Sequence, residues 1–207
     1  MDPVVRDILD ASMAEFAEHG FAGARVDAIA ARTQTSKRML YYHFGSKQGL
    51  YSAALAHAYL RVRQRLTPAA EPAALPLQAL RQWVGEVFDV HAANPQFVRL
   101  VMGENLSGGR TVQQAPAIRQ TNLMGLDELQ AILQRGQADG SFRADLLAMD
   151  VYANAVGLAF HFVSNRSTFS AIFEQGHDPA QVQAARRACI LDTIERQVAA
   201  PGVASSG

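Results

Sequence analysis

The segment at residues 26–47, VDAIAARTQTSKRMLYYHFGSK, constrains the fold of this chain more than any other stretch. Its first apolar side chains are spaced at i, i+3 and i+4, which places them on one face of a helix: Val26, Ile29 and Ala30. A polar break follows, and Ser36 then stands where a helix N-cap belongs, because its hydroxyl can accept a backbone N–H of the next turn. Two short helices joined in this way are typical of a helix-turn-helix.

The second helix of this pair is predicted to bury one narrow stripe and to expose the rest of its surface. Leu40 and Phe44, four residues apart, form the buried stripe. The remaining polar and bulky side chains are expected to point outward: Lys37, Arg38, Met39, Tyr42 and His43. A short helix that opens with two cations and ends in exposed aromatic side chains suits the groove of a DNA duplex.

The charge distribution agrees with a polyanionic partner. The chain has a formal net charge of zero, but residues 36–66 carry six cations and no acid, whereas residues 1–35 and 67–207 each carry three more acids than cations. A positive block within a neutral chain is expected to attract a polyanion such as DNA. The alternative explanation of this block is a solvated helix face without a partner.

The rest of the chain predicts further helices and no strand, because no segment shows sustained alternation of apolar and polar residues. The length of 207 residues suits one domain or two small ones. Outside the helix-turn-helix, helices are predicted at residues 3–19 (ending at Gly20), 46–66, 76–93, 95–107, 111–138 (broken near Pro116), 146–164 and 179–198. The predicted fold class is all-α.

Prolines and composition suggest how the chain is divided. Pro68, Pro72 and Pro76 forbid a continuous helix and mark the clearest boundary in the chain. By function, we expect a three-helix DNA-binding domain at residues 1–47, followed by a helical ligand-binding and dimerisation domain at residues 48–199 that includes a connecting helix at 48–66. The small, polar residues 200–207 are predicted to form a disordered tail.

The sequence favours a reducing, cytoplasmic environment without a membrane partner. Cys189 is the only cysteine, so no disulfide can form within the chain. The N-terminal residues include several acids and no uninterrupted apolar run, which argues against a signal peptide. The most apolar stretch, residues 151–163, is too short to span a bilayer.

This same stretch, VYANAVGLAFHFV, is informative because it is apolar almost all round. Such a helix must be covered on more than one side, either by the core of its own chain or by a second subunit. If the last helix pairs with it, two copies of each would form an isologous four-helix interface. The residues expected at that interface are Val151, Ala155, Leu158, Phe162, Val182, Ala185, Cys189 and Thr193. For Cys189 alone, the simplest interpretation is a packed small apolar side chain.

The N-terminal third resembles the tetracycline-repressor (TetR) family of bacterial transcription regulators. The resemblance covers about residues 5–55 and rests on a helix end at Phe16 to Gly20, on Val26-x-x-Ile29-Ala30, and on Ser36-x-x-x-Leu40-Tyr41-Tyr42-His43-Phe44-x-Ser46-Lys47-x-x-Leu50. The C-terminal two thirds match only in the number and length of helices. The resemblance implies a regulator, most simply a repressor, that binds a palindromic site on double-stranded DNA as a homodimer and is released by a small molecule.

The turn between the two helices and position 38 depart from the family pattern. The family commonly has Ala-Gly-Val between the two helices, where this chain has Thr33, Gln34 and Thr35. Glycine tolerates a left-handed backbone, so Gln34 is expected to introduce strain of ~1 kcal/mol. Position 38 is often Gly or Pro in the family, and Arg38 adds a long hydrogen-bond donor where base edges are read.

The resemblance implies that Tyr42, His43 and Lys47 hold the phosphate backbone, and their O–H and N–H groups suit that role. Ser36 is expected to donate to phosphate as well. The predicted base contacts are Lys37 and Arg38, since arginine can grip guanine O6 and N7 together, and Met39 at a thymine methyl group. Arg25 and Val26 are placed to approach the backbone or a base. Tyr41 is expected to pack against the first helix.

A small-molecule pocket is predicted from polar or bulky residues on otherwise apolar helices: Trp83, Phe88, His91, Arg99, Met102, Asn105, Asn122, Phe160 and His161. Most of these side chains can equally be ordinary core. Arg99 and Arg110 would suit an anionic ligand, although surface ion pairs explain them as well. For His161, a core or pocket position is favoured over a ligand role.

The sequence contains no motif for metal binding or catalysis. His57 and His91 lack a second ligand at i+3 or i+4, so no metal site is expected, and no cofactor is predicted. Nucleophile elbows, P-loops and paired carboxylates are missing from the pattern, which argues against an enzyme. The alternative function is an all-helical small-molecule carrier or protein-interaction module that does not read DNA.

Overall fold

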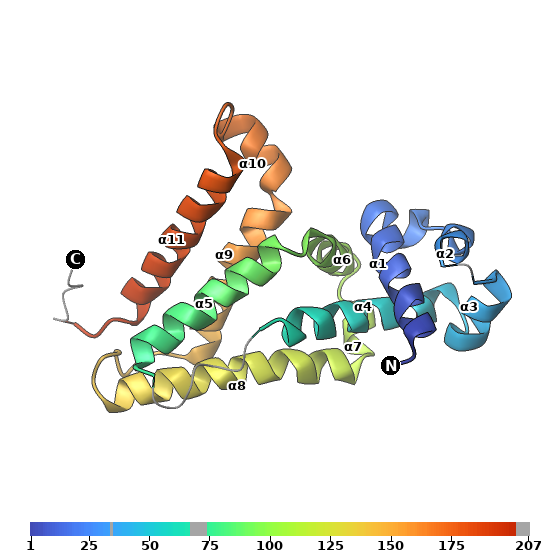
Figure 1. Cartoon of the computed structure of the whole chain (residues 1–207). Helices are drawn as coiled ribbons and strands as arrows, with labels where there is room; N and C mark the ends of the chain where they lie inside the picture. Colours follow the sequence, from blue (N-terminus) through green and yellow to red (C-terminus); the bar gives the residue numbers. More distant parts are fainter. Residues whose placement is uncertain (34, 67–73, 202–207) are drawn as a thin grey trace. The chain divides into compact units, whose positions relative to one another are not determined.

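The computed structural model describes residues 1–33, 35–66 and 74–201, and these residues are helical apart from turns and one isolated antiparallel bridge between Phe142 and Ala199. Figure 1 shows the eleven helices that they form. Their bounds are α1 Pro3–Gly23, α2 Val26–Arg32, α3 Lys37–Phe44, α4 Lys47–Gln64, α5 Pro76–Ala92, α6 Pro95–Leu106, α7 Arg110–Gln113, α8 Pro116–Ala138, α9 Ala148–Ser164, α10 Arg166–Phe173 and α11 Pro179–Val198. The predicted all-α class is confirmed.

Most helix ends lie where proline or glycine was expected to place them. Proline occupies the first turn of α1, α5, α6 and α11, where its missing N–H has no helical partner to lose. Gly20 interrupts α1 with φ +66°, so the helix end predicted there is a kink followed by one more turn. The break near Pro116 separates α7 from α8. The short helix α10 was not predicted.

The described chain forms two compact units, each discussed by itself. The first unit contains residues 1–64 and 94–122, and the second contains residues 65–93 and 123–207. The helix at 47–64 is therefore part of the first unit, together with α6 and α7. The predicted functional division at residues 47 and 48 stays a prediction, and the predicted disorder of the tail falls largely on residues 202–207, outside the described ones.

In the first unit, α1 packs against α4 and α6, α2 packs against α1 and α3, and α3 packs against α4. The apolar stripe of α1 supplies much of this core, with Ile8, Leu9, Met13 and Phe16 buried. Phe16 also meets Tyr51 of α4 edge to face, with 5.0 Å between ring centroids. Burying each such side chain stabilises the fold by roughly 1.5–3 kcal/mol, so this contact fixes α1 on α4.

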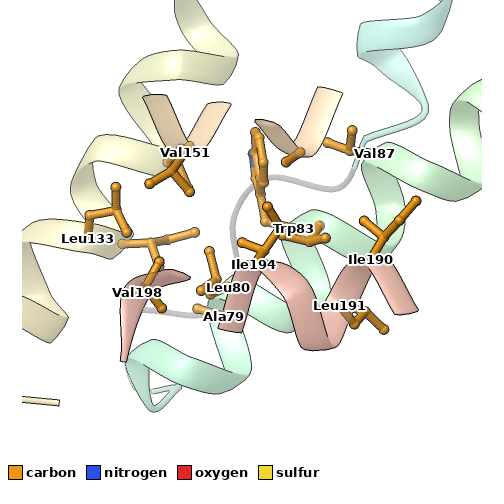
Figure 2. Close-up of a cluster of buried hydrophobic side chains, with 14 of the residues drawn as sticks. Ala79, Leu80, Trp83, Val87, Leu133, Val151, Ile190, Leu191, Ile194 and Val198 are labelled. Carbon is orange, nitrogen blue, oxygen red and sulfur yellow. The ribbon is translucent and has the colours of Figure 1, made fainter. Parts of the chain in front are cut away.

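In the second unit, α5, α8, α9 and α11 surround a single apolar core. Figure 2 shows Trp83 and Leu80 of α5 facing Val151 of α9 and Ile194 of α11. The side chains of Phe88 and Phe162 add an aromatic contact with 5.2 Å between ring centroids. The apolar stripe of α9 is thus covered by its own chain.

This packing corrects part of the predicted dimer interface. Val151 and Ala155 are 0% and 1% exposed within a single chain, so they cannot contact a partner. Phe162 is half-buried against Phe88, and its place at an interface stays a prediction. The prediction was wrong at Val151 and Ala155 because the buried face of α9 was assigned to a second subunit instead of to α5 and α11. Cys189 is also exposed, contrary to the packed position expected for it.

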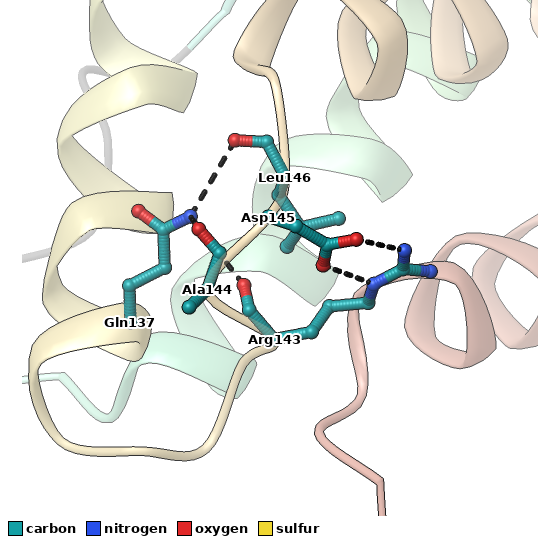
Figure 3. A network of polar contacts seen from close by, with 5 residues as sticks. All are labelled: Gln137, Arg143, Ala144, Asp145 and Leu146. Carbon is teal, nitrogen blue, oxygen red and sulfur yellow. Dashed lines mark hydrogen bonds and ion pairs between the residues drawn. The ribbon is translucent and has the colours of Figure 1, made fainter.

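The turn between α8 and α9 is held by side-chain contacts to the backbone. Figure 3 shows Gln137, near the end of α8, donating through Nε2 to the carbonyl oxygens of Arg143, Ala144 and Leu146. The guanidinium of Arg143 in turn grips both carboxylate oxygens of Asp145. These contacts fix the start of α9 relative to the end of α8.

Among the described helices, none is long and apolar enough to cross a bilayer.

Candidate nucleic-acid interface

The start of α2 is capped from α1 by a buried carboxylate. Arg25 precedes α2 and supplies no side-chain cap of its own. Instead, Glu15, which is buried, accepts the backbone N–H of Arg25 through Oε1 at 3.0 Å, and its Oε2 lies 3.4 Å from Nη2 of Arg32. Because one carboxylate meets both ends of α2, α1 fixes the orientation of that helix.

The turn between α2 and α3 is closed by threonine hydroxyls. Thr33 is buried and donates to the carbonyl of Ile29 at 3.1 Å, and Thr35 donates to the carbonyl of Thr33 at 3.1 Å. These bonds satisfy carbonyl groups that the helix end would otherwise leave without partners. The strain predicted for Gln34 lies outside the described residues.

Two serine caps fix both ends of the exposed helix. Ser36 accepts the backbone N–H of Met39 at 3.2 Å, as predicted, and Ser46 accepts that of Gly49 at 3.0 Å at the start of α4. Gly45 ends α3 with φ +73°, a conformation that glycine adopts readily. A Cβ on Gly49 would lie 2.0 Å from the carbonyl oxygen of Phe44, so only glycine allows α4 to begin this close to α3.

The face of α3 predicted to be exposed is exposed. Leu40 is buried and Phe44 is half-buried, whereas Tyr42 is 79% exposed. The other members of the outward face are exposed as well: Lys37, Arg38, Met39 and His43. Tyr41 is 40% exposed, so the packing position expected for it was wrong. The aromatic rings of Tyr42 and His43 meet edge to face, with 5.4 Å between centroids.

The cations of this surface differ in whether they have intramolecular partners. Lys37 donates to Oδ2 of Asp27 in α2 at 3.0 Å, and this hydrogen bond holds the pKa of the lysine above its usual value. Lys47 donates to the carbonyl of Ala22 at 3.2 Å and lies 5.1 Å from the centroid of the Phe21 ring. Within the described part of the chain, Arg38 has no hydrogen-bond or ion-pair partner. Arg38 is therefore the cation of α3 that is available to a ligand.

Val26 does not belong to this surface. It is 7% exposed and lies on the buried face of α2 together with Ile29. The i, i+3 spacing that predicted the helix also directs Val26 inward, so its predicted approach to DNA was wrong. Arg25, beside it, is exposed.

Several positioning residues were missed because they act over long sequence separations. Asp27 and Lys37 pair across the turn, and Asp10 of α1 accepts from Nε2 of His57 at 2.9 Å and from Nη1 of Arg61 at 2.5 Å in α4. No helical period links such positions. The sequence signal that could have indicated these pairs is the excess of acids in residues 1–35, directly before the basic block at residues 36–66. Part of that block is thus neutralised within the chain.

The predicted effector residues are divided between the two units. Trp83, Phe88 and His91 belong to the second unit and are buried in it, as parts of α5. Phe160 and His161 lie at the end of α9 in the same unit. The other four residues belong to the first unit: Arg99, Met102, Asn105 and Asn122. Within the described part of the second unit, the Trp83 Nε1–H is buried and has no acceptor.

Comparisons with known proteins agree with this geometry. Residues 8–54, from α1 into α4, match the family described as "Bacterial regulatory proteins, tetR family". Residues 76–194 match the family described as "Tetracyclin repressor-like, C-terminal domain". The second match covers more than half of the chain, including all of α5 to α10.

Individual relatives extend over most of the chain. The HTH-type transcriptional repressor NicS of Pseudomonas putida is 33% identical over 165 residues, which are 80% of this chain and 78% of that protein. The crystal structure of the transcriptional regulator SCO4942 from Streptomyces coelicolor has a TM-score of 0.72 at 28% identity, covering 96% of this chain and 99% of the other. FadR from Bacillus subtilis, solved in complex with stearoyl-CoA, shares the fold with a TM-score of 0.71 at 18% identity, over 92% and 97% of the two chains.

The helix-turn-helix geometry and these matches lead to the same assignment. The chain belongs to the tetR family of bacterial regulatory proteins and is a helix-turn-helix DNA-binding transcription regulator.

Proposed function

We propose that this protein is a repressor that binds a palindromic operator as a dimer and is released by a small molecule. The observation that carries the proposal is the outward face of α3. There Arg38, which has no partner among the described residues, lies between a Ser36-capped helix start and the exposed Tyr42. NicS, which covers 80% of this chain, is named a transcriptional repressor, and this name supports repression as the direction of regulation. FasR of Mycolicibacterium smegmatis, which covers 76% of the chain at 27% identity, is named an activator. A regulator of bacterial genes works where the DNA is, so we infer a cytoplasmic location.

Each exposed residue of α3 has a role that its chemistry supports. Arg38 can donate two parallel hydrogen bonds to guanine O6 and N7 in the major groove. Tyr42, His43 and Ser36 can donate to phosphate oxygens on either side. Lys37 and Lys47 first have to exchange their partners, Asp27 and the Ala22 carbonyl, for nucleic acid. Their contribution is therefore smaller than that of cations without partners.

The proposed dimer forms through faces of α9 and α11 that the chain leaves exposed. On α9 these are Asn154, Gly157 and Leu158, and on α11 they are Ala185, Cys189 and Thr193, at i, i+4 and i+8. Small side chains at this spacing let two helices approach closely. A two-fold axis would bring the same faces of two protomers together and place two copies of α3 about 34–36 Å apart, one turn of DNA.

The effector is proposed to act on the second unit. The FadR relative is described in complex with stearoyl-CoA, which shows that this fold can accommodate a small molecule. Here the buried Trp83 Nε1–H lacks an acceptor among the described residues. A buried donor without an acceptor destabilises the folded state, and a bound ligand that accepts this hydrogen bond would remove that cost. Release of DNA requires that the effector bind the DNA-free arrangement more tightly than the DNA-bound one.

A binding experiment with the promoter region upstream of the protein's own gene tests the proposal. Affinity should fall steeply with salt, with a slope of about −0.9 per phosphate neutralised. Arg38→Ala should weaken binding by ~1–3 kcal/mol and relax sequence preference, because a base contact is lost. Lys47→Ala, the matched control, should weaken all sequences alike, because it loses a phosphate contact.

The alternative function gives a different result in the same experiment. A carrier or interaction module that does not read DNA would show no retention on heparin and no salt-dependent binding to the promoter. Equal loss of sequence discrimination in Arg38→Ala and Lys47→Ala would contradict the roles assigned to these two residues. Salt-dependent binding without any preference for the promoter would contradict the operator proposal.

A further inference from the structure

A small pocket opens where the end of α9, the helix α10 and the first half of α11 meet, entirely within the second unit. Its volume is about 60 Å³, and its lining consists of His161, Phe162, Arg166, Phe169, Glu174 and Arg186. Two guanidinium groups and one carboxylate therefore face a space that is otherwise walled by aromatic rings.

The charges in this pocket are unequal. Arg166 and Glu174 form an ion pair, with side chains 29% and 12% exposed, so the one acid of the lining is already neutralised. Arg186 has no ion-pair partner among the described residues. The lining thus keeps one surplus positive charge, which an anion entering the pocket would neutralise.

The aromatic walls hold both guanidinium groups in place. The Arg166 guanidinium lies 5.2 Å from the centroid of the Phe162 ring, and that of Arg186 lies 5.8 Å from the centroid of the Phe169 ring. His161 meets Phe169 edge to face at 6.2 Å, and Phe173 adds a further ring at 4.8 Å from Phe169. Guanidinium groups stacked on rings lose little freedom when they bind a planar oxyanion, so the pocket is preorganised for one.

The size of the pocket limits what can enter. Sites for whole small molecules usually measure roughly 300–1,000 Å³, several times the volume found here. A carboxylate or phosphate group fits, while the body of a larger ligand would have to remain outside, near the exposed side chain of Phe173.

We propose that this pocket binds the oxyanion group, carboxylate or phosphate, of a small molecule, with Arg186 as its principal partner. The pocket is expected to bind the anion in the protein without DNA. A second statement, that this anion is part of the effector, rests on the proposed function. Anion binding and the role of the anion in release are tested separately.

The first test measures binding to the full-length protein without DNA. Calorimetric titrations use benzoate, inorganic phosphate and, as an uncharged analogue, benzyl alcohol. We expect benzoate or phosphate to bind and benzyl alcohol not to bind. A preference for benzoate identifies a carboxylate with an apolar body, and a preference for phosphate identifies a phosphate group. Binding of neither anion, or equal binding of benzyl alcohol, overturns the proposal.

Variants locate the binding site. Arg186→Ala and the longer Arg186→Gln should each weaken the anion that binds by roughly tenfold or more, because a charge-assisted hydrogen bond is lost. Arg196→Ala is the control, since Arg196 lies on the same helix, pairs with Asp192 alone among the residues that the structure describes, and is far along the helix from the pocket lining. Unchanged affinity in a folded Arg186 variant, or an equal loss in Arg196→Ala, overturns the assignment to this pocket.

The second test adds promoter DNA. If the bound anion belongs to the effector, it should lower the affinity for DNA, and the Arg186 variants should require at least tenfold more of it. Anion binding without any effect on DNA leaves the pocket in place and refutes its role in release. Failure to bind promoter DNA at all refutes the proposed function, whereas the calorimetric result still decides whether the pocket takes an oxyanion.

Discussion

At the scale of single residues, the surface of α3 is shaped by which cations are already paired. Lys37 and Arg38 are neighbours in the sequence and both exposed, yet Lys37 is bound to Asp27 and Arg38 has no partner in the described chain. Both side chains of the Lys37–Asp27 pair are about half exposed, so water and salt screen their interaction. DNA can therefore compete for Lys37, and the carboxylate left behind would then face the phosphates.

Replacing Asp27 should strengthen binding to DNA. Asp27→Asn removes a negative charge beside the duplex and releases Lys37, so we expect affinity for all sequences to rise severalfold and the salt dependence to become steeper. Fluorescence anisotropy with labelled promoter DNA at several salt concentrations measures both quantities. Asp192→Asn, which breaks an exposed pair in α11, is the control. Weaker binding by Asp27→Asn would show that the pair serves to orient α3.

His91 provides a prediction about pH. It is buried at the end of α5, where its Nδ1 lies 2.6 Å from the carbonyl oxygen of Val87, and burial holds its pKa below the usual 6.5. The unfolded chain then binds more protons than the folded one below pH ~6.5, so stability is full above that pH and is lost as the pH falls.

Urea unfolding at pH 7.5 and pH 5.5 measures this loss. In His91→Leu, the difference in free energy of unfolding between the two pH values should be smaller than in the unmodified protein. His177→Gln is the control, because it removes a histidine that is exposed, before α11. It should leave the difference in free energy of unfolding between the two pH values unchanged. An unaltered pH dependence in His91→Leu would mean that other groups cause the acid sensitivity.

At the scale of helices, proline, glycine and capping residues predicted the helices well, but they did not predict which helices contact one another. Pro95 and Pro179 each begin a helix where the sequence predicted one, because proline is tolerated in the first turn of a helix and not in its interior. Pro116, where a break was predicted, begins α8. The eight-residue α10 was missed, since a single residue, Asn165, separates it from the end of α9 and it has no side-chain cap. Pairs such as Asp10 with His57 depend on how α1 crosses α4, which no helical period encodes.

Glu104 shows how one buried acid can join three helices. It lies in α6 and accepts the hydroxyl of Tyr51 in α4 at 3.1 Å and the backbone N–H groups of Thr111 and Val112 in α7 at 2.6 and 3.2 Å. Burial, followed by the charge of Glu104, raises the pKa of Tyr51, so this hydroxyl stays protonated as a donor. Three donors therefore depend on a single carboxylate.

Removal of this carboxylate should destabilise the first unit. Glu104→Ala leaves a buried hydroxyl and two backbone N–H groups without an acceptor, so we expect the free energy of unfolding to fall by about 2–4 kcal/mol. Urea unfolding followed by circular dichroism measures the change. Glu18→Ala, at an exposed position of α1, should change stability by less than ~0.5 kcal/mol. A loss as small as that of the control would show that water replaces the carboxylate.

At the scale of the whole molecule, the sequence identified the two helices of the proposed dimer but not which of their faces are free. The periodicity of α9 is apolar all round, so it cannot distinguish the face that packs on α5 from the face left for a partner. Burial makes that distinction: Val151 and Ala155 are inside, whereas Leu158 is 38% exposed. The exposed faces of α9 and α11 remain without a covering element among the described residues, as expected if a second protomer supplies it.

A charge placed on the exposed face of α9 should separate the protomers. In a two-fold interface every residue appears twice, so Leu158→Glu introduces two carboxylates that lose water when the proposed interface forms. Analytical ultracentrifugation should show a monomer where the unmodified protein sediments as a dimer, with unchanged helical content by circular dichroism. The affinity for a palindromic promoter site should fall by two orders of magnitude or more, because the two reading helices no longer bind as one ligand.

Leu106→Glu, at an exposed position of α6, carries the same change outside the proposed interface and should remain a dimer. A dimeric Leu158→Glu protein with full affinity would place the interface elsewhere on the chain.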